Sequence, residues 1–235
     1  IPRLSRIKSL GLALAKNITT NDLDYLHPLP SLEILTLNGQ RITDVQIQRI
    51  TESSPHLKEF HLHWCRDLTG DVLVHLANLP HLEALEFSET KLTKQGVEAI
   101  GKMRKLKHLN VSTDTDAFGL IDQLRKLPKL DSAHLGGEWL GDSELKELAD
   151  HPTLRELRLL GTSISDEGLR HLTGLDKLEY LRIFESSNVT DEGLKYLESL
   201  ETLRRLDLKE TGVTTEGVAE LKQALPKCKI EIYSQ

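Results

Sequence analysis

The sequence is poor in aromatic residues, cysteine and long apolar runs, and each shortage excludes a class of protein. Aromatic residues make up 4% of the 235 residues, so aliphatic side chains must build the core. No apolar run approaches the roughly 20 residues of a membrane-spanning helix, so we expect no membrane span. Two cysteines, Cys65 and Cys228, are too few for a disulfide framework. Free cysteines are typical of proteins in a reducing cytoplasm, although a secreted or periplasmic location stays open.

Positive charge is also in short supply. Thirty lysines and arginines stand against 36 acidic residues, which leaves a net charge of −6. Generic nucleic-acid binding needs a basic face, and a polybasic membrane anchor needs a basic segment. We therefore expect neither nucleic acid nor a membrane surface as a partner.

The pattern L-x-x-L-x-L recurs along the whole chain. Its copies start 24 or 25 residues apart, at positions 7, 32, 57, 82, 106, 130, 154, 178 and 203. KIEIY, residues 229–233, has the pattern of a further strand at the end of the chain. We therefore predict a single domain, residues 1–235, made of about nine repeats and a C-terminal capping strand.

The second half of each repeat has the pattern of a helix. ISDEGLRHL (164–172) and VTDEGLKYL (189–197) superimpose, and ITTNDLDYL (18–26) fits them. The Ser or Thr is a typical N-cap, and the acids after it suit the positive end of the helix dipole. One repeat departs from the pattern, because Asp116 stands where the others have an aliphatic residue. We expect Phe118 to fill that gap and the helix there to be short.

These units resemble the leucine-rich repeat, whose period of about 20–29 residues covers this one. The form L-x-L-x-x-(T/C)-x-(I/V)-T-D-E-G-L is similar to the cysteine-containing, ribonuclease-inhibitor-like subclass found in many bacterial proteins, notably planctomycete ones. The resemblance implies an α/β fold, a right-handed solenoid or horseshoe with parallel strands on the concave face and helices on the convex face. It also implies a soluble, non-catalytic protein that binds other proteins.

The stretch HLHWC, residues 61–65, has two alternating histidines. In the repeat register the leucines point into the core, and His61 and His63 point to the concave face. Cys65 takes an inward position, where we expect a small buried residue. Glu86 lies about 5 Å away on the next strand, so His61, His63 and Glu86 could form a metal or small-ligand site. Zinc needs three or four converging ligands, so we favour a polar patch without metal or cofactor.

Two groups of residues are predicted to bind a partner on the concave face. The C-terminal strands combine arginines with exposed apolar side chains, which is the composition of binding hot spots. This first group is Arg158, Leu160, Tyr180, Arg182, Phe184 and Arg205. The second group, on the middle strands, is His61, His63, Trp64, Glu86, His108 and His134. The arginines suit an acidic segment of a partner protein through bidentate pairing.

Catalytic motifs are missing from the sequence. It contains no G-x-S-x-G, no P-loop and no H-E-x-x-H. We therefore predict a monomeric, non-catalytic module for protein–protein interaction, although a fold alone does not establish a function. Two alternatives stay open: a metal- or ligand-binding repeat protein, and a structural or sensor arm of a larger polypeptide.

Overall fold

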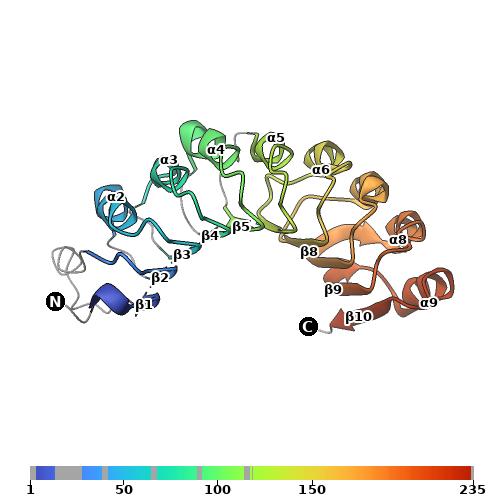
Figure 1. The fold of residues 1–235 in the computed structure, drawn as a ribbon. Coiled ribbons are helices and arrows are strands. Elements are labelled where there is room, and N and C mark those ends of the chain that lie inside the picture. Colours follow the sequence, from blue (N-terminus) through green and yellow to red (C-terminus); the bar gives the residue numbers. More distant parts are fainter. Residues whose placement is uncertain are drawn as a thin grey trace. The chain divides into compact units, whose positions relative to one another are not determined.

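The computed structural model describes residues 4–13, 28–38, 42–64, 68–88, 92–113, 117 and 119–233. The chain divides into two compact units, Ile1–Lys129 (unit 1) and Leu130–Gln235 (unit 2). Within each unit, helices cover one face of a layer of parallel strands (Figure 1). The predicted α/β solenoid of strand–helix repeats is confirmed.

The strands of unit 1 are parallel and pair in chain order. They are β1 (Ser9–Ala13), β2 (Ile34–Asn38), β3 (Glu59–His63), β4 (Ala84–Ser88) and β5 (His108–Ser112). The helices are η1 (Leu4–Arg6, a 3-10 turn), α2 (Asp44–Glu52), α3 (Val72–Leu76), α4 (Lys94–Ile100) and α5 (Leu120–Leu124). The helix predicted over residues 18–26 lies outside the described residues.

Unit 2 repeats this arrangement. Its strands are β6 (Ser132–Gly136), β7 (Glu156–Leu160), β8 (Tyr180–Thr190), β9 (Arg205–Gly212) and β10 (Lys229–Tyr233). Its helices are α6 (Asp142–Leu148), α7 (Asp166–His171), η3 (Leu172–Gly174), α8 (Asp191–Leu197) and α9 (Thr215–Ala224).

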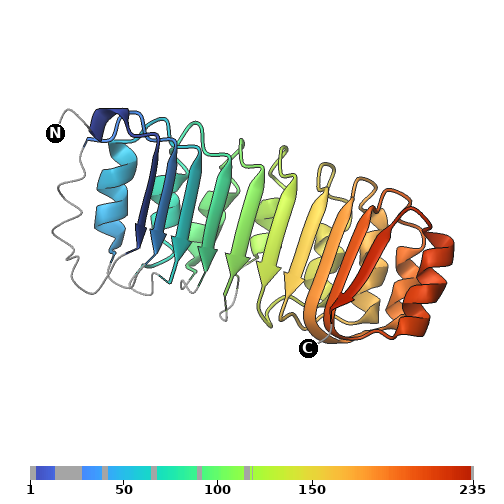
Figure 2. The same cartoon turned by 90° about the horizontal axis from the view of Figure 1, so that it is seen from below.

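Alternation along each strand separates the core from the bare face of the sheet. In β3, Phe60 and Leu62 are fully buried while His61 between them stays partly exposed. In β7, Leu157 and Leu159 are fully buried in the same way. Burying such a side chain stabilises the fold by about 1.5–3 kcal/mol. The strand face that carries no helices, seen in Figure 2, is called the open face.

The Ser/Thr-Asp-Glu-Gly motif at residues 165–168 and 190–193 ties helices α7 and α8 to the preceding repeat. The Thr190 hydroxyl accepts a hydrogen bond from the amide of Glu192 at the start of α8. The backbone N–H and the hydroxyl of Thr190 both donate to the Asp166 carboxylate, each at 2.7 Å. A Cβ at Gly193 would lie 2.4 Å from Oδ1 of Asp166, so the motif needs glycine there. The acids predicted to suit the helix dipole therefore also bind the cap of the next repeat.

The short helix predicted in the irregular repeat is confirmed. Helix α5 has 5 residues and begins after Gly119, whose φ of 74° suits glycine. Three residues with predicted roles, Cys65, Asp116 and Phe118, lie outside the described residues.

Candidate functional site

The open face of unit 2 brings the first predicted group of residues together. Strand register places Arg158 beside Arg182, and Leu160 beside Phe184. The same register places Tyr180 beside Arg205 on the next strand. We call this set the arginine patch: Arg158, Leu160, Tyr180, Arg182, Phe184 and Arg205.

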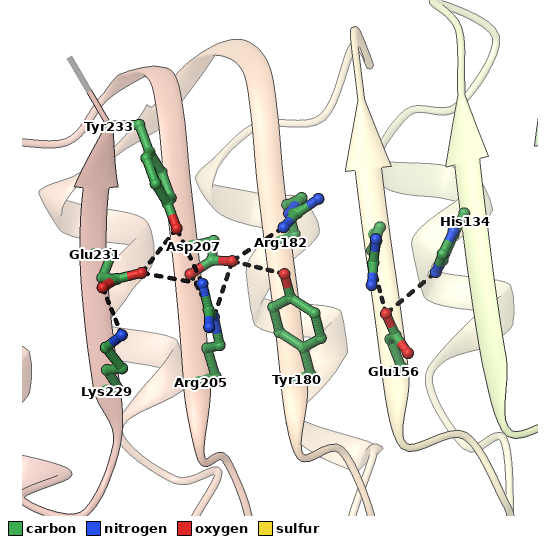
Figure 3. Close-up of polar contacts among 10 residues, drawn as sticks. His134, Glu156, Tyr180, Arg182, Arg205, Asp207, Lys229, Glu231 and Tyr233 are labelled. Carbon is green, nitrogen blue, oxygen red and sulfur yellow. Dashed lines mark hydrogen bonds and ion pairs between the residues drawn. The ribbon is translucent and has the colours of Figure 1, made fainter.

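A buried carboxylate, Asp207, lies at the centre of the patch (Figure 3). Its side chain is 0% exposed although it belongs to the open face of β9. The Tyr180 hydroxyl donates to it at 2.6 Å, and Nε of Arg205 donates at 2.8 Å. Arg182 adds a contact at 3.3 Å. Burial alone would raise the pKa of Asp207, but these donors outweigh it, so the pKa is lowered and the carboxylate stays charged.

The guanidinium group of Arg205 donates its hydrogen bonds to other side chains of the same chain. Besides Asp207, its Nη2 donates to Glu231 and to the Tyr233 hydroxyl, each at 3.0 Å. Glu231 also accepts from the Tyr233 hydroxyl at 2.7 Å and pairs with Lys229 at 2.7 Å. Arg205 therefore holds the patch together, and its pKa is raised further, mainly by the hydrogen bond to Asp207.

Arg158 and Arg182 keep part of their donor capacity unused. Nε of Arg158 binds Glu156, and its two Nη groups have no polar partner among the described residues. Arg182 binds Asp207 through Nη2, and its buried Nε has no partner in the same part of the chain. Their side chains are 33% and 29% exposed, so a bound group can reach their Nη groups from solvent but not the buried Nε of Arg182.

Aromatic rings hold these two guanidinium groups in place. Arg158 lies 5.1 Å and Arg182 lies 5.6 Å from the centre of the Tyr180 ring, and Arg182 lies 4.8 Å from that of Phe184. Such cation–π contacts fix the planes of the guanidinium groups. Phe184 in turn meets the Tyr233 ring edge-on at 5.9 Å, and Leu160 beside it is 45% exposed.

His134 on β6 extends the polar network of unit 2. Its Nε2 lies 3.2 Å from Glu156 and 3.2 Å from the Ser132 hydroxyl. The pKa of Glu156 would be raised by burial, but the neighbouring Arg158 and His134 lower it. Glu156 therefore stays charged and links the histidine to the arginine patch.

The open face of unit 1 has a different centre, His61 on β3. Its Nδ1 lies 3.1 Å from Glu86 and its Nε2 lies 3.5 Å from Glu59. Asn110 donates to the other oxygen of Glu86 at 2.6 Å. The hydrogen bond with Glu86 is the main cause of a raised pKa for His61, which burial partly offsets.

The second predicted group is divided between the units, because His134 lies in unit 2 and the other members lie in unit 1 with His61. His63 shares the strand of His61, and Trp64 follows it with a φ of 58° and 52% of its surface exposed. His108 pairs in register with Ala84, so it lies two strands away from the equivalent position on β3. Both ring nitrogens of His61 face carboxylates. Over the described residues, no group of three or more His, Cys, Asp or Glu side chains is arranged to hold a metal ion.

The residues that organise the unit 2 site were not among those predicted to bind. They are Glu156, Asp207, Glu231 and Tyr233. For Glu156 and Asp207 the signal is in the repeat register, because each lies two residues from one arginine of the patch and directly across from a second patch residue, Tyr180 or Arg182. Acidic residues at those spacings are partners for the arginines.

Comparison with known proteins agrees with this architecture. The family model of the leucine-rich repeat matches residues 78–101 and 199–222. Two segments of this chain therefore match the leucine-rich repeat. The bovine (Bos taurus) NLR family CARD domain-containing protein 4 is 26% identical to this leucine-rich-repeat chain over 216 residues. That match covers 78% of the chain and only 21% of the bovine protein.

Two solved structures from Listeria monocytogenes share the leucine-rich-repeat fold. Internalin C2 superimposes with a TM-score of 0.56 at 22% identity, over 92% of this chain and 84% of its own. The internalin InlF superimposes with a TM-score of 0.55 at 17% identity, over 100% of this chain and 84% of its own. At these identities the likeness shows the fold alone. Across the described residues, no helix has the length and apolar character needed to cross a membrane.

Proposed function

We propose that this leucine-rich-repeat chain is a non-catalytic protein–protein interaction module that binds its partner on the open face of unit 2. The observation that carries the proposal is the combination, in the arginine patch, of unused guanidinium donors with the exposed Leu160 and the half-buried Phe184. Folding does not require this combination, because the buried leucines already supply the core. Binding would remove both features from water at once, as in the centre of a protein interface.

The chemistry of the patch favours an acidic segment of a protein as the partner. Arginine pairs with carboxylates through two parallel hydrogen bonds, and here the guanidinium planes are already fixed by rings. Preorganised donors lose little conformational entropy on binding. Nucleic acid is a poor fit, because the chain carries a net charge of −6 and the patch contains its own carboxylates. We propose that the protein acts as a monomer and needs no cofactor.

We also propose that the repeats belong to the cysteine-containing, ribonuclease-inhibitor-like subclass of bacterial, planctomycete-type proteins. The support is the recurring Ser/Thr-Asp-Glu-Gly cap, whose Thr190–Asp166 contacts join one repeat to the next. A second candidate function is a sensor arm within a larger polypeptide. Its support is that the match covers only 21% of the bovine relative.

Partner capture from a cell lysate tests the main proposal. The bait is the wild-type chain, compared with a triple variant, Arg158→Glu, Arg182→Glu and Phe184→Ala. The matched control reverses two exposed charges on the helix side, Arg125→Glu and Lys222→Glu. We expect a protein that the wild type and the control retain and the triple variant loses.

Two outcomes would contradict the proposal. The first is a partner retained equally by all three baits, because the contact would then lie elsewhere. The second is a partner lost by the control as well, because binding would then follow general charge rather than the patch. Circular dichroism of each bait confirms that all are folded before capture.

A further inference from the structure

We propose that the arginine patch binds an extended segment of a partner protein. In that segment one acidic residue and one apolar residue are two positions apart. The acidic side chain lies between Arg158 and Arg182, and the apolar side chain lies against Leu160 and Phe184. This inference rests on the proposed function and adds the chemical form of the partner.

The acidic position follows from the unused donors. Arg158 and Arg182 are register partners on adjacent strands, so their Cα atoms are about 5 Å apart. Each guanidinium group pairs with a carboxylate of its own chain through one nitrogen, Nε of Arg158 and Nη2 of Arg182. The Nε of Arg182 is buried, so only its Nη groups can meet a ligand from solvent. One carboxylate from solvent can accept from both side chains.

Charge balance supports an acidic ligand for this network. The four cations of the network are Arg158, Arg182, Arg205 and Lys229, and their carboxylate partners are Glu156, Asp207 and Glu231. With His134 neutral, one positive charge is left over. Arg182 and Arg205 share Asp207, and Arg205 and Lys229 share Glu231, so the surplus charge belongs to the network as a whole. A single additional carboxylate neutralises it.

The position for the apolar side chain lies two residues further along the same two strands. Leu160 follows Arg158 by two residues and Phe184 follows Arg182 by two, and the two apolar side chains are register partners. Two residues of a strand span about 6.6 Å. Side chains i and i+2 of an extended segment point the same way with the same separation. The patch and an extended segment therefore share one period, which fixes the spacing.

Selection from a displayed library of random extended peptides on the intact chain tests the inference. We expect the enriched peptides to share an acidic and an apolar residue at i and i+2, in one direction along the chain. Arg182→Gln should weaken their binding about tenfold or more, as expected for a lost hydrogen bond to a charged group. Lys222→Gln, on the helix side, should leave it unchanged. Arg158→Glu with Arg182→Glu should instead select a lysine in the place of the acid.

The outcomes separate the inference from the proposed function. Peptides that lose binding in the Arg158→Glu and Arg182→Glu variant but lack the i, i+2 pair overturn the spacing and keep the site. Peptides that bind the variant as well as the wild type overturn the site itself. A selection that enriches no peptide counts against both.

Discussion

The open faces of the two units share one backbone plan and differ in what lies at their centres. In unit 1 the centre is His61, a titratable ring held between Glu59 and Glu86. In unit 2 the centre is Asp207, a fully buried carboxylate under Tyr180 and two arginines. The inward positions are occupied by buried apolar side chains in both units. The difference therefore comes entirely from side chains that the core does not constrain.

This comparison shows how a repeat separates the side chains that form the core from those that are free to vary. The leucines fill the core in the same way in both units, so the outward positions can change without altering the backbone. Unit 1 uses this freedom for a small polar network with a net acidic character. Unit 2 uses it for arginines, aromatic rings and the exposed Leu160. Apolar exposure itself occurs in both units, because Trp64 in unit 1 is also exposed. The described strands of unit 1 contain no arginine, so only the open face of unit 2 combines that exposure with guanidinium donors.

The largest predicted effect tests whether the inward positions are equivalent. Leu85→Ala in unit 1 and Leu157→Ala in unit 2 should each lower the free energy of unfolding by about 2–5 kcal/mol, because each leaves a core cavity. Their outward neighbours, Glu86→Ala and Arg158→Ala, should cost about 1 kcal/mol or less. Chemical denaturation measures all four. Equal losses at Leu157 and Arg158 would mean that the two faces of the strand are assigned in reverse.

The next effect separates the two centres. Asp207→Asn should lower the free energy of unfolding by about 1–3 kcal/mol, because Asn cannot accept from all the donors that surround the buried carboxylate. Glu86→Gln should cost less than about 1 kcal/mol, since its side chain is 30% exposed. The same denaturation experiment compares them. A Glu86→Gln loss as large as that of Asp207→Asn would remove the distinction between the centres.

The smallest effect is in the pH dependence of the two centres, which should have opposite signs. The pKa of His61 is raised above 6.5, so its stabilising contribution is complete below about pH 6.5 and is lost as the pH rises through the folded pKa. The pKa of Asp207 is lowered below 3.8, so its contribution is present above about pH 3.8 and is lost as the pH falls through the folded pKa. NMR titration of the His61 ring should give a midpoint above 6.5 that falls in the Glu86→Gln variant. A midpoint unchanged by that substitution would exclude Glu86 as the cause.

The sequence predicts the parts of this structure that depend on period. The alternating leucines of the L-x-x-L-x-L pattern predict that Leu157 points inward and Arg158 outward. Successive side chains of a strand point to opposite faces of the sheet. The repeat spacing also predicts which side chains are register partners, such as Arg158 and Arg182. Both inferences need only the backbone, so one sequence is enough for them.

The contacts within the open face could not be predicted in the same way. Asp207 takes an outward position and is nevertheless fully buried, because Tyr180 and Arg205 from neighbouring positions fold over it. Arg205, predicted to meet a partner, directs its donors at Asp207, Glu231 and Tyr233 instead. These outcomes depend on the rotamers of long side chains, which the period of the repeat leaves free.

Site-specific photo-crosslinking tests the central claim most directly. A photoreactive phenylalanine analogue is placed at Phe184 on the open face of unit 2, and in a second chain at Tyr196 on helix α8. The account predicts that a captured partner crosslinks from position 184 and not from position 196. Crosslinking from position 196 alone would place the partner on the helix side and contradict recognition by the arginine patch.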